Sequence, residues 1–345
     1  MLWWLLLRRI VSVMRDLVSN KRTLFITTKN LDYIRNTQEI KILQNTSKSV
    51  NIIGSNAKSY LMRLIRVYSM LLFVSVKKYD LIFVGFAPQL IVPFFKRKFR
   101  NVYLIVDFFI SVYDTFIFDR SIFPQNSIIA KLLKQVDIIT ISAADHIISD
   151  TRAHGDYFSK EFGVARGKIT ELYLQADKSI YYPRKIRRCN ELIDKFIVLY
   201  FGSVLPLQGF DIVLKAVEQL KDHSDIYFYI IGPVKKQKRV LNNNIEYIEW
   251  LPQDELARYI AVSDLCLAGH FNAEIDKAKR TIPGKAYIYS SMGKRMILGN
   301  NMANHELYDD SHNDIYFVEM GSPDKLANMI KEVKNKYHCN DAVDA

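Results

Sequence analysis

The sequence alternates short, uninterrupted apolar runs with stretches of helical character. In the first half, the apolar runs predict strands at residues 24–27, 50–53, 81–85, 102–107, 138–141 and 169–172. Strands that are apolar along their whole length are buried on both faces, as in a parallel sheet that helices cover. Helices are expected between these strands, notably at residues 58–78 and 151–162.

A second series follows a polar and basic stretch at residues 182–188, which we interpret as a linker. Its predicted strands are residues 196–201, 226–231, 245–249, 265–268 and 296–298, and its predicted helices are residues 210–220, 254–262, 284–292 and 322–336. A length of 345 residues also favours two domains over one. The pattern predicts an α/β protein with two doubly wound, Rossmann-like domains that face a central cleft.

We place the first domain at residues 23–183 and the second at residues 184–345, with the last helix either in the second domain or packed back on the first. Residues 1–22 begin with an apolar run that is too short to span a bilayer. As a helix, this segment gathers its polar residues on one face, namely Arg8, Ser12, Arg15, Asp16 and Ser19. We expect an amphipathic helix that lies in a membrane interface, or alternatively one that packs on its own domain.

The net charge of +12 lies in the first half of the chain. Residues 1–180 hold 26 Lys and Arg against 14 Asp and Glu, whereas residues 181–345 hold 22 of each kind. Such a basic half suits a nucleic acid or an anionic membrane. Apolar residues 90–95 stand beside basic residues 96–100, which favours the anionic membrane surface. No aromatic-basic recognition motif is present, so nucleic acid is not an expected partner.

The three cysteines are far apart in the sequence, and the seven histidines show no metal-binding spacing. Both observations favour a reducing compartment and a protein without a metal site. We therefore expect a cytoplasmic protein that is peripheral on the inner face of the cytoplasmic membrane.

A basic cluster surrounds the predicted start of the helix near Pro283, and its members are Lys277, Lys279, Arg280 and Lys285. The amino end of a helix is already positive, so cations there are favourable when an anion occupies the same place. We expect Arg280 and Lys285 at this helix end. The alternative is a solvated basic loop.

A glycine-flanked turn follows the first strand of the second domain, where residues 202–209 read GSVLPLQG. Gly202 and Gly209 permit the backbone to approach a phosphate closely at a strand-to-helix turn. The same glycines are also compatible with a turn that only satisfies backbone geometry.

Four runs of the second half occur in a familiar order: VLYFGSVLPLQGFDIVLKAVEQL, IYFYIIGP, IEWLPQDELARYIAVSDLCLA and KAKRTIPGKAYIYSSMGKRMIL. They resemble the donor domain of GT-B glycosyltransferases, most of all family 4 of the retaining enzymes. Residues 206–209 and 277–285 resemble two motifs of a bacterial polysaccharide-biosynthesis subgroup. The first half is similar to that subgroup in VGFAPQ, VDFFISVYDTFIFDR and SDTRAHGDYF.

The resemblance implies a nucleotide-sugar donor that contacts the second domain at Gly202, Ser203, Gln208, Gly209, Gly232, Lys277, Arg280, Pro283, Lys285 and Ile288. Ser203 and Gln208 replace two basic residues that bind the diphosphate in the wider family. Arg280 and Ile288 replace two glutamates, and an isoleucine cannot accept a hydrogen bond from a sugar hydroxyl. We expect Lys277, Arg280 and Lys285 to supply the missing charge, with Arg280 and Lys285 catalytic. The rival interpretation is that nucleotide binding has been lost.

In the first domain, Asp107 ends a predicted strand and is either the base for an acceptor hydroxyl or a turn carboxylate. Asp114 and Arg120 are expected either to contact the acceptor or to form a structural ion-pair set with Asp119. His154 follows a strand and a loop, and it either reaches the acceptor side of the cleft or has a structural role.

Together these expectations describe a glycosyltransferase that moves a sugar from a nucleotide-sugar donor to a lipid-linked or growing glycan acceptor in cell-surface polysaccharide synthesis. By resemblance the reaction retains configuration and needs neither a metal nor a cofactor. The alternative is a non-catalytic GT-B-like protein that binds a glycan, a lipid or a partner protein.

Overall fold

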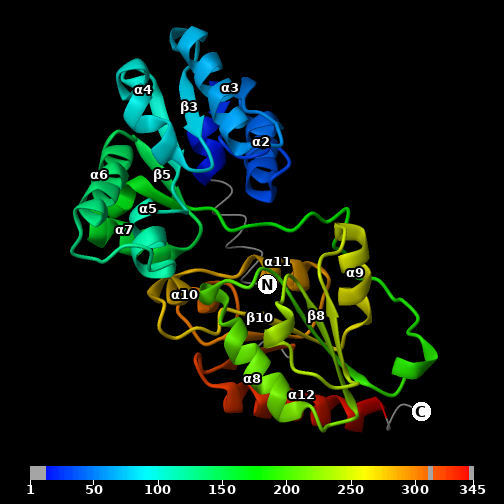
Figure 1. Cartoon of the computed structure of the whole chain (residues 1–345). Helices are drawn as coiled ribbons and strands as arrows, with labels where there is room; N and C mark the ends of the chain where they lie inside the picture. Colours follow the sequence, from blue (N-terminus) through cyan, green and yellow to red (C-terminus); the bar gives the residue numbers. More distant parts are fainter. Residues whose placement is uncertain (1–12, 310–313, 342–345) are drawn as a thin grey trace. The chain divides into compact units, whose positions relative to one another are not determined.

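The computed structural model describes residues 13–309 and 314–341, with side chains described up to residue 337. The chain divides into two compact units, Met1–Gln175 and Ala176–Ala345 (Figure 1). The boundary expected from the sequence lies between residues 183 and 184, in the extended segment that follows this division.

The first unit is built on a six-stranded parallel sheet with the strand order β2-β1-β3-β4-β5-β6. The strands are β1 (Arg22–Ile26), β2 (Ser49–Ile53), β3 (Leu81–Val84), β4 (Tyr103–Asp107), β5 (His146–Ser149) and β6 (Ile169–Glu171). The helices are α2 (Ile34–Thr46), α3 (Tyr60–Phe73), α4 (Val92–Phe99), α5 (Val112–Asp114), α6 (Ile128–Ser142) and α7 (Arg152–Phe162). A π-helical turn, Thr115–Asp119, continues α5.

Both faces of this sheet are buried at its central strands, as the apolar runs predicted, whereas the edge strand β2 is largely exposed. Leu24 and Ile26 of β1 lie in one core cluster together with residues of α3 and α4. Phe25, between them, lies in a second cluster with Met14 and Val18. Alternate residues of a strand point to opposite faces, so the two clusters cover opposite faces of the sheet.

The helical turn at residues 13–18 therefore packs on its own domain, which is the alternative that the sequence left open. Residues 1–12, which carry most of the expected membrane-interface helix, lie outside the described residues. In the part of the chain that is described, no helix has the length and apolarity needed to cross a bilayer.

Two apolar runs in the first half differ from their predictions. Residues 138–141 are the last turns of α6 and not a strand, and the missing strand is β5, a few residues later. Helical burial of Ala130, Asp137 and Ile141 along one face overrides the strand propensity of the β-branched run. Residues 90–95 are not exposed as one apolar run either, because Ile91, Val92 and Phe95 are core residues and only Phe94 is exposed.

The second unit has another six-stranded parallel sheet, with the strand order β12-β11-β10-β7-β8-β9. The strands are β7 (Phe196–Phe201), β8 (Ile226–Ile231), β9 (Ile245–Ile248), β10 (Leu265–Gly269), β11 (Met296–Gly299) and β12 (Ile315–Val318). The helices are α8 (Phe210–Leu220), α9 (Gln253–Val262), α10 (Asp276–Arg280), α11 (Gly284–Ser291) and α12 (Pro323–Asp341). The predictions for β7, α8 and β8 are confirmed residue for residue, whereas α10 and β12 were not predicted.

The last helix packs within the second unit. Figure 1 shows α12 beside α8, and the two helices are in contact. Leu326, Ile330 and Val333 of α12 are buried in the same core cluster as Val213 and Val217 of α8.

A buried carboxylate in α6 holds two loops of the first unit in place. Asp137 accepts hydrogen bonds from the Ser111 hydroxyl at 2.6 Å, the Tyr113 amide at 2.9 Å and Gln89 Nε2 at 2.9 Å. A fourth bond comes from the Val112 amide at 3.2 Å. Gln89 belongs to the 3-10 turn in the connection after β3. Ser111 lies in the connection after β4, and Val112 and Tyr113 are the first residues of α5, which follows it. Burial raises the pKa of Asp137 to about 6, although its hydrogen bonds oppose the shift.

We expect Asp137→Asn to lower the free energy of unfolding at neutral pH by roughly 1–3 kcal/mol, because either amide orientation puts an NH₂ group against a donor. The wild type should become more stable as the pH falls toward 5, since the folded state then binds a proton that the unfolded chain does not.

Urea unfolding of both variants at pH 5 and pH 7 measures these effects, with Asp32→Asn at an exposed position as the matched control. Equal stability of Asp137→Asn and the wild type at both pH values would contradict the anchoring role.

Candidate functional site

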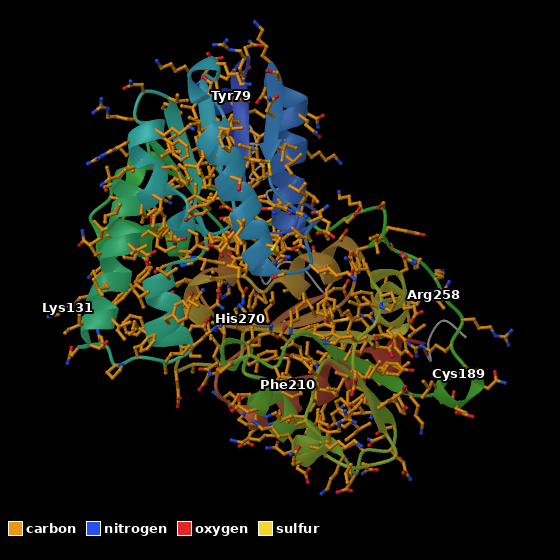
Figure 2. All side chains as sticks on the ribbon, turned by 45° about the horizontal axis from the view of Figure 1, so that its top comes forward. Tyr79, Lys131, Cys189, Phe210, Arg258 and His270 are labelled. Atoms are coloured by element: carbon orange, nitrogen blue, oxygen red, sulfur yellow. The ribbon has the colours of Figure 1, made fainter. Side chains whose placement is uncertain are left out.

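The loops after three adjacent strands of the second sheet meet at its carboxyl edge. Gly202 follows β7, Gly232 follows β8, and Gly269 ends β10. The chain order of the strands reverses between β7 and β10, which is where parallel sheets of this kind hold their ligands. Figure 2 labels two residues of this region. His270 is the residue after β10, and Phe210 is the first residue of α8.

Two predicted glycines are needed here for close packing. Gly209 has φ +65, and a Cβ atom on it would lie 2.5 Å from the Asn272 amide nitrogen. A Cβ atom on Gly232, which has φ +147, would lie 2.2 Å from the carbonyl oxygen of Gly202. Both positions therefore require glycine for backbone conformation and for space.

The loop after β10 holds the glycine-flanked turn in place through two hydrogen bonds. The Phe271 amide donates to the carbonyl oxygen of Gln208 at 3.1 Å, and Asn272 Nδ2 donates to that of Pro206 at 3.0 Å. Helix α10 also contacts the 3-10 turn Pro206–Gln208. These contacts hold the turn at the carboxyl edge of the sheet.

Lys285 reaches this turn from the first turn of α11. Its Nζ donates to Gln208 Oε1 at 2.9 Å, and the same oxygen accepts the Tyr200 hydroxyl at 2.7 Å. The ammonium group also lies 3.8 Å from the centre of the Tyr200 ring, within the range of a cation–π contact. A Cβ atom on Gly202 would be 3.3 Å from Nζ. The structure therefore brings together Gly202, Gln208 and Lys285, as predicted for the donor site.

The electrostatic state of Lys285 is unusual. The side chain is 6% exposed, and its pKa lies well below the usual range for lysine because burial disfavours the charged form. Burial is the one cause that acts on this pKa, so no carboxylate in the described part of the chain compensates the ammonium group. Its hydrogen-bond partner is a neutral amide oxygen. The position is suited to an anion that enters from outside the chain.

The rest of the basic cluster is arranged differently from the prediction. Lys277, Lys279 and Arg280 lie in the last turn of the five-residue helix α10, and Thr281 and Pro283 are extended. The expectation that Arg280 sits at a helix amino end is therefore wrong, whereas Lys285 does sit there. Pro283 is the residue before the helix and not its first residue, because α11 begins at Gly284.

The other residues that were predicted to bind the nucleotide-sugar donor are buried or half-buried in the second unit. Lys277 is buried, and its carbonyl oxygen accepts the Thr281 hydroxyl at 2.9 Å. Ser203 is half-buried just after β7. Ile288 is half-buried on α11 between Tyr287 and Tyr289, which are both core residues. Lys279 is exposed and pairs with Asp276 at 2.8 Å.

In the first unit, Asp107 belongs to a buried ion pair that the sequence did not indicate. Arg35 donates to both of its oxygens, at 3.0 and 2.7 Å, and both side chains are buried. Glu39 lies 3.6 Å from Arg35, and burial raises the pKa of this carboxyl well above its usual range. A buried carboxylate whose two oxygens both accept hydrogen bonds from an arginine is not placed to act as the base for an acceptor hydroxyl. The structure therefore favours a structural role for Asp107.

The predicted acceptor-side residues have separate environments. His154 is buried on α7, with its Nδ1 2.7 Å from Asp150 Oδ1 and its ring 4.1 Å from that of Phe158. Asp114 is buried in α5, and its amide donates to Ser111 Oγ. Arg120 is exposed at the end of the π-helical turn. The burial of His154 and Asp114 favours the structural alternatives that the sequence left open.

Sequence reasoning missed Arg35, Glu39 and Asp137. The first two stand four residues apart, which is the spacing of neighbours on one helix face and was a usable signal for α2. Among the residues that the structure describes, no three His, Cys, Asp or Glu side chains are grouped to hold a metal ion.

Comparisons with known proteins give matches only among solved structures. No protein-family model matches the chain, and no curated protein matches it significantly. Sucrose-phosphate synthase from Thermosynechococcus elongatus superposes with a TM-score of 0.65 at 13% identity, over 91% of this chain and 90% of that one. Anabaena Alr3699/HepE in complex with UDP gives 0.62 at 14% identity, over 91% and 90%.

A glycosyltransferase from Rickettsia africae gives a TM-score of 0.61 at 13% identity, over 92% of this chain and 89% of that one. Identities this low establish the fold and leave the activity open. With its two six-stranded parallel sheets, the chain has the GT-B fold.

Proposed function

We propose that the chain is a glycosyltransferase that moves a sugar from a nucleotide-sugar donor to a lipid-linked or growing glycan acceptor in cell-surface polysaccharide synthesis. The observation that carries the proposal is Lys285, a buried cation without a carboxylate partner at the glycine-flanked turn. A nucleoside diphosphate would supply the missing charge. Structures similar in fold support a donor of this class, since HepE has been solved with UDP and with UDP-glucose.

In the proposed reaction, the bond between the sugar and the diphosphate breaks and a bond to the acceptor hydroxyl oxygen forms. The acceptor proton passes to the departing phosphate oxygen, and the configuration of the sugar is retained. Lys285 and the amides at the start of α11 stabilise the charge that develops on the leaving diphosphate. Arg280 adds positive charge from the neighbouring helix α10. This scheme needs no protein nucleophile and no metal.

The second candidate is a GT-B-like protein without catalytic activity, and Ile288 is the observation that favours it. Its side chain cannot form a hydrogen bond, whereas the glycosyltransferase family that the sequence resembles carries a glutamate at this position, which contacts the nucleotide ribose. Release of a nucleoside diphosphate from a panel of nucleotide sugars, with a glycan acceptor present, separates the two candidates. Turnover above background supports the transferase, and nucleotide binding without turnover supports the binding protein.

The proposal also places the protein at the inner face of the cytoplasmic membrane, where a lipid-linked acceptor is available. The support is the charge distribution, since the whole excess of 26 Lys and Arg over 14 Asp and Glu falls in residues 1–180.

We expect Lys285→Gln to weaken the binding of a nucleoside diphosphate about 10- to 100-fold, because one charge-assisted hydrogen bond is lost. Calorimetric titration with UDP, GDP, ADP and dTDP measures the effect. Lys279→Gln is the matched control, since Lys279 is exposed and paired with Asp276. Equal affinity of Lys285→Gln and the wild type would remove Lys285 from the site.

Binding should also take up a proton. Burial lowers the pKa of Lys285, so part of the free protein carries a neutral Lys285 at basic pH, and the bound anion raises that pKa again. The affinity of the wild type should therefore fall as the pH rises above neutrality, whereas that of Lys285→Gln should not. Titrations in buffers with different ionisation enthalpies count the proton directly, and a buffer-independent enthalpy would contradict this account.

A further inference from the structure

The solvent-facing side of α3 is apolar, although the helix lies on the surface of the first unit. Leu61 is 65% exposed and Phe73 is 89% exposed, and Met62, Ile65 and Leu72 are also exposed. These five residues fall on one side of the helix, whereas Arg63, Val67 and Leu71 on the other side are buried. An apolar patch this continuous is rare on a surface that contacts only water.

Helix α4 extends the apolar patch. Phe94 is 69% exposed, and its ring centre lies 5.9 Å from that of the α3 residue Tyr68. Lys98 Nζ donates to the carbonyl oxygen of Leu72 at 2.9 Å, which ties α4 to the end of α3. We call the exposed side of α3 together with Phe94 the apolar face.

A hollow of about 520 Å³ adjoins the apolar face between α3 and the edge strand β2. Ile52, Met70 and Phe73 line it, together with Tyr79. Tyr79 is labelled in Figure 2. The apolar face therefore combines protruding apolar side chains with a concavity of mixed polarity, since Asn51, Ser69 and Lys78 also line the hollow.

The charge around the apolar face has one sign. Residues 40–106 contain 11 Lys and Arg and a single acidic residue, Asp80, which pairs with Arg22. Exposed basic residues stand at both ends of α3, on its exposed side and on α4, namely Lys58, Arg66, Lys77, Lys78, Lys96, Arg97 and Arg100. A protein partner with an ordinary mixed surface would not require this uniform charge.

We propose that the apolar face and its basic rim dock the protein on an anionic phospholipid membrane. Apolar side chains enter the boundary between headgroups and acyl chains, and the basic residues contact the phosphates. The inference rests on the peripheral membrane location in the proposed function and names the surface that makes the contact. Its test needs no nucleotide and no turnover.

The described part of the amino-terminal segment does not form this surface. Among residues 13–18, Met14 and Val18 pack on the sheet face that carries Phe25. Helix α3 packs on the opposite face, through Val67 and Leu71 against Leu24 and Ile26. The apolar face is therefore a separate candidate for membrane contact from residues 1–22. Phe94 and the basic residues of α4 belong to residues 90–100, which the sequence also indicated.

The test uses the full chain and sedimentation with vesicles of phosphatidylglycerol and phosphatidylcholine. The double variant Leu61→Ser/Phe73→Ser should reduce partitioning at least about tenfold, since two large apolar side chains are lost from the membrane boundary. Lys96→Gln/Arg97→Gln should reduce it about fivefold for each charge and lower its salt sensitivity. The matched control is Leu241→Ser, because Leu241 is 85% exposed in the second unit.

Three results would overturn the proposal. The first is wild-type partitioning of Leu61→Ser/Phe73→Ser, which would assign membrane contact elsewhere, for example to residues 1–22. The second is equal binding to vesicles of phosphatidylcholine alone, which would remove the role of the basic rim. The third is loss of self-association in light scattering without a change in vesicle binding, which would make the apolar face a contact between two copies. Unchanged thermal unfolding confirms that each variant is folded.

Discussion

The hydrogen bond from Lys285 to Gln208 joins two segments that are 77 residues apart and gives the strand-end loops of the second unit a common centre. The turn after β7, the loop after β10 and the first turn of α11 meet there because all strands of a parallel sheet end at the same edge. Gly209 and Gly232 permit the approach, since any side chain on them would collide with neighbouring backbone. The site therefore depends on the sheet topology as much as on its own residues.

The buried polar groups of the two units are in contrasting states. In the first unit, Arg35 is compensated by Asp107, and Asp137 accepts four hydrogen bonds from two loops. Such satisfied groups hold loops and helices in place, which is the usual role of buried polar residues. Lys285 has a neutral acceptor and a lowered pKa, so its charge is stabilised incompletely by the chain. That difference is the reason for assigning ligand binding to the second unit.

The first unit differs from the second in the apolar and basic side chains that it exposes on its surface. Its basic residues surround an apolar helix side, and the arrangement is complementary to a membrane in both polarity and charge. We propose a donor site on the second unit and a membrane-facing surface on the first, and the transfer of a sugar to a lipid-linked acceptor would use both.

The sequence by itself determined the fold class, most strands and the glycine turn, because these follow from patterns within one element or one loop. The bounds of β7, α8 and β8 follow from apolar periodicity alone. Tertiary structure decided that residues 138–141 are helical, that Asp107 is paired with Arg35 across 72 residues, and that Lys285, not Arg280, lies in the first turn of a helix. It also decided that α3 exposes several apolar side chains, whereas only Phe94 of residues 90–95 is exposed. Periodicity shows that a segment has an apolar side, but whether that side loses its contact with water depends on neighbours that are distant in the sequence.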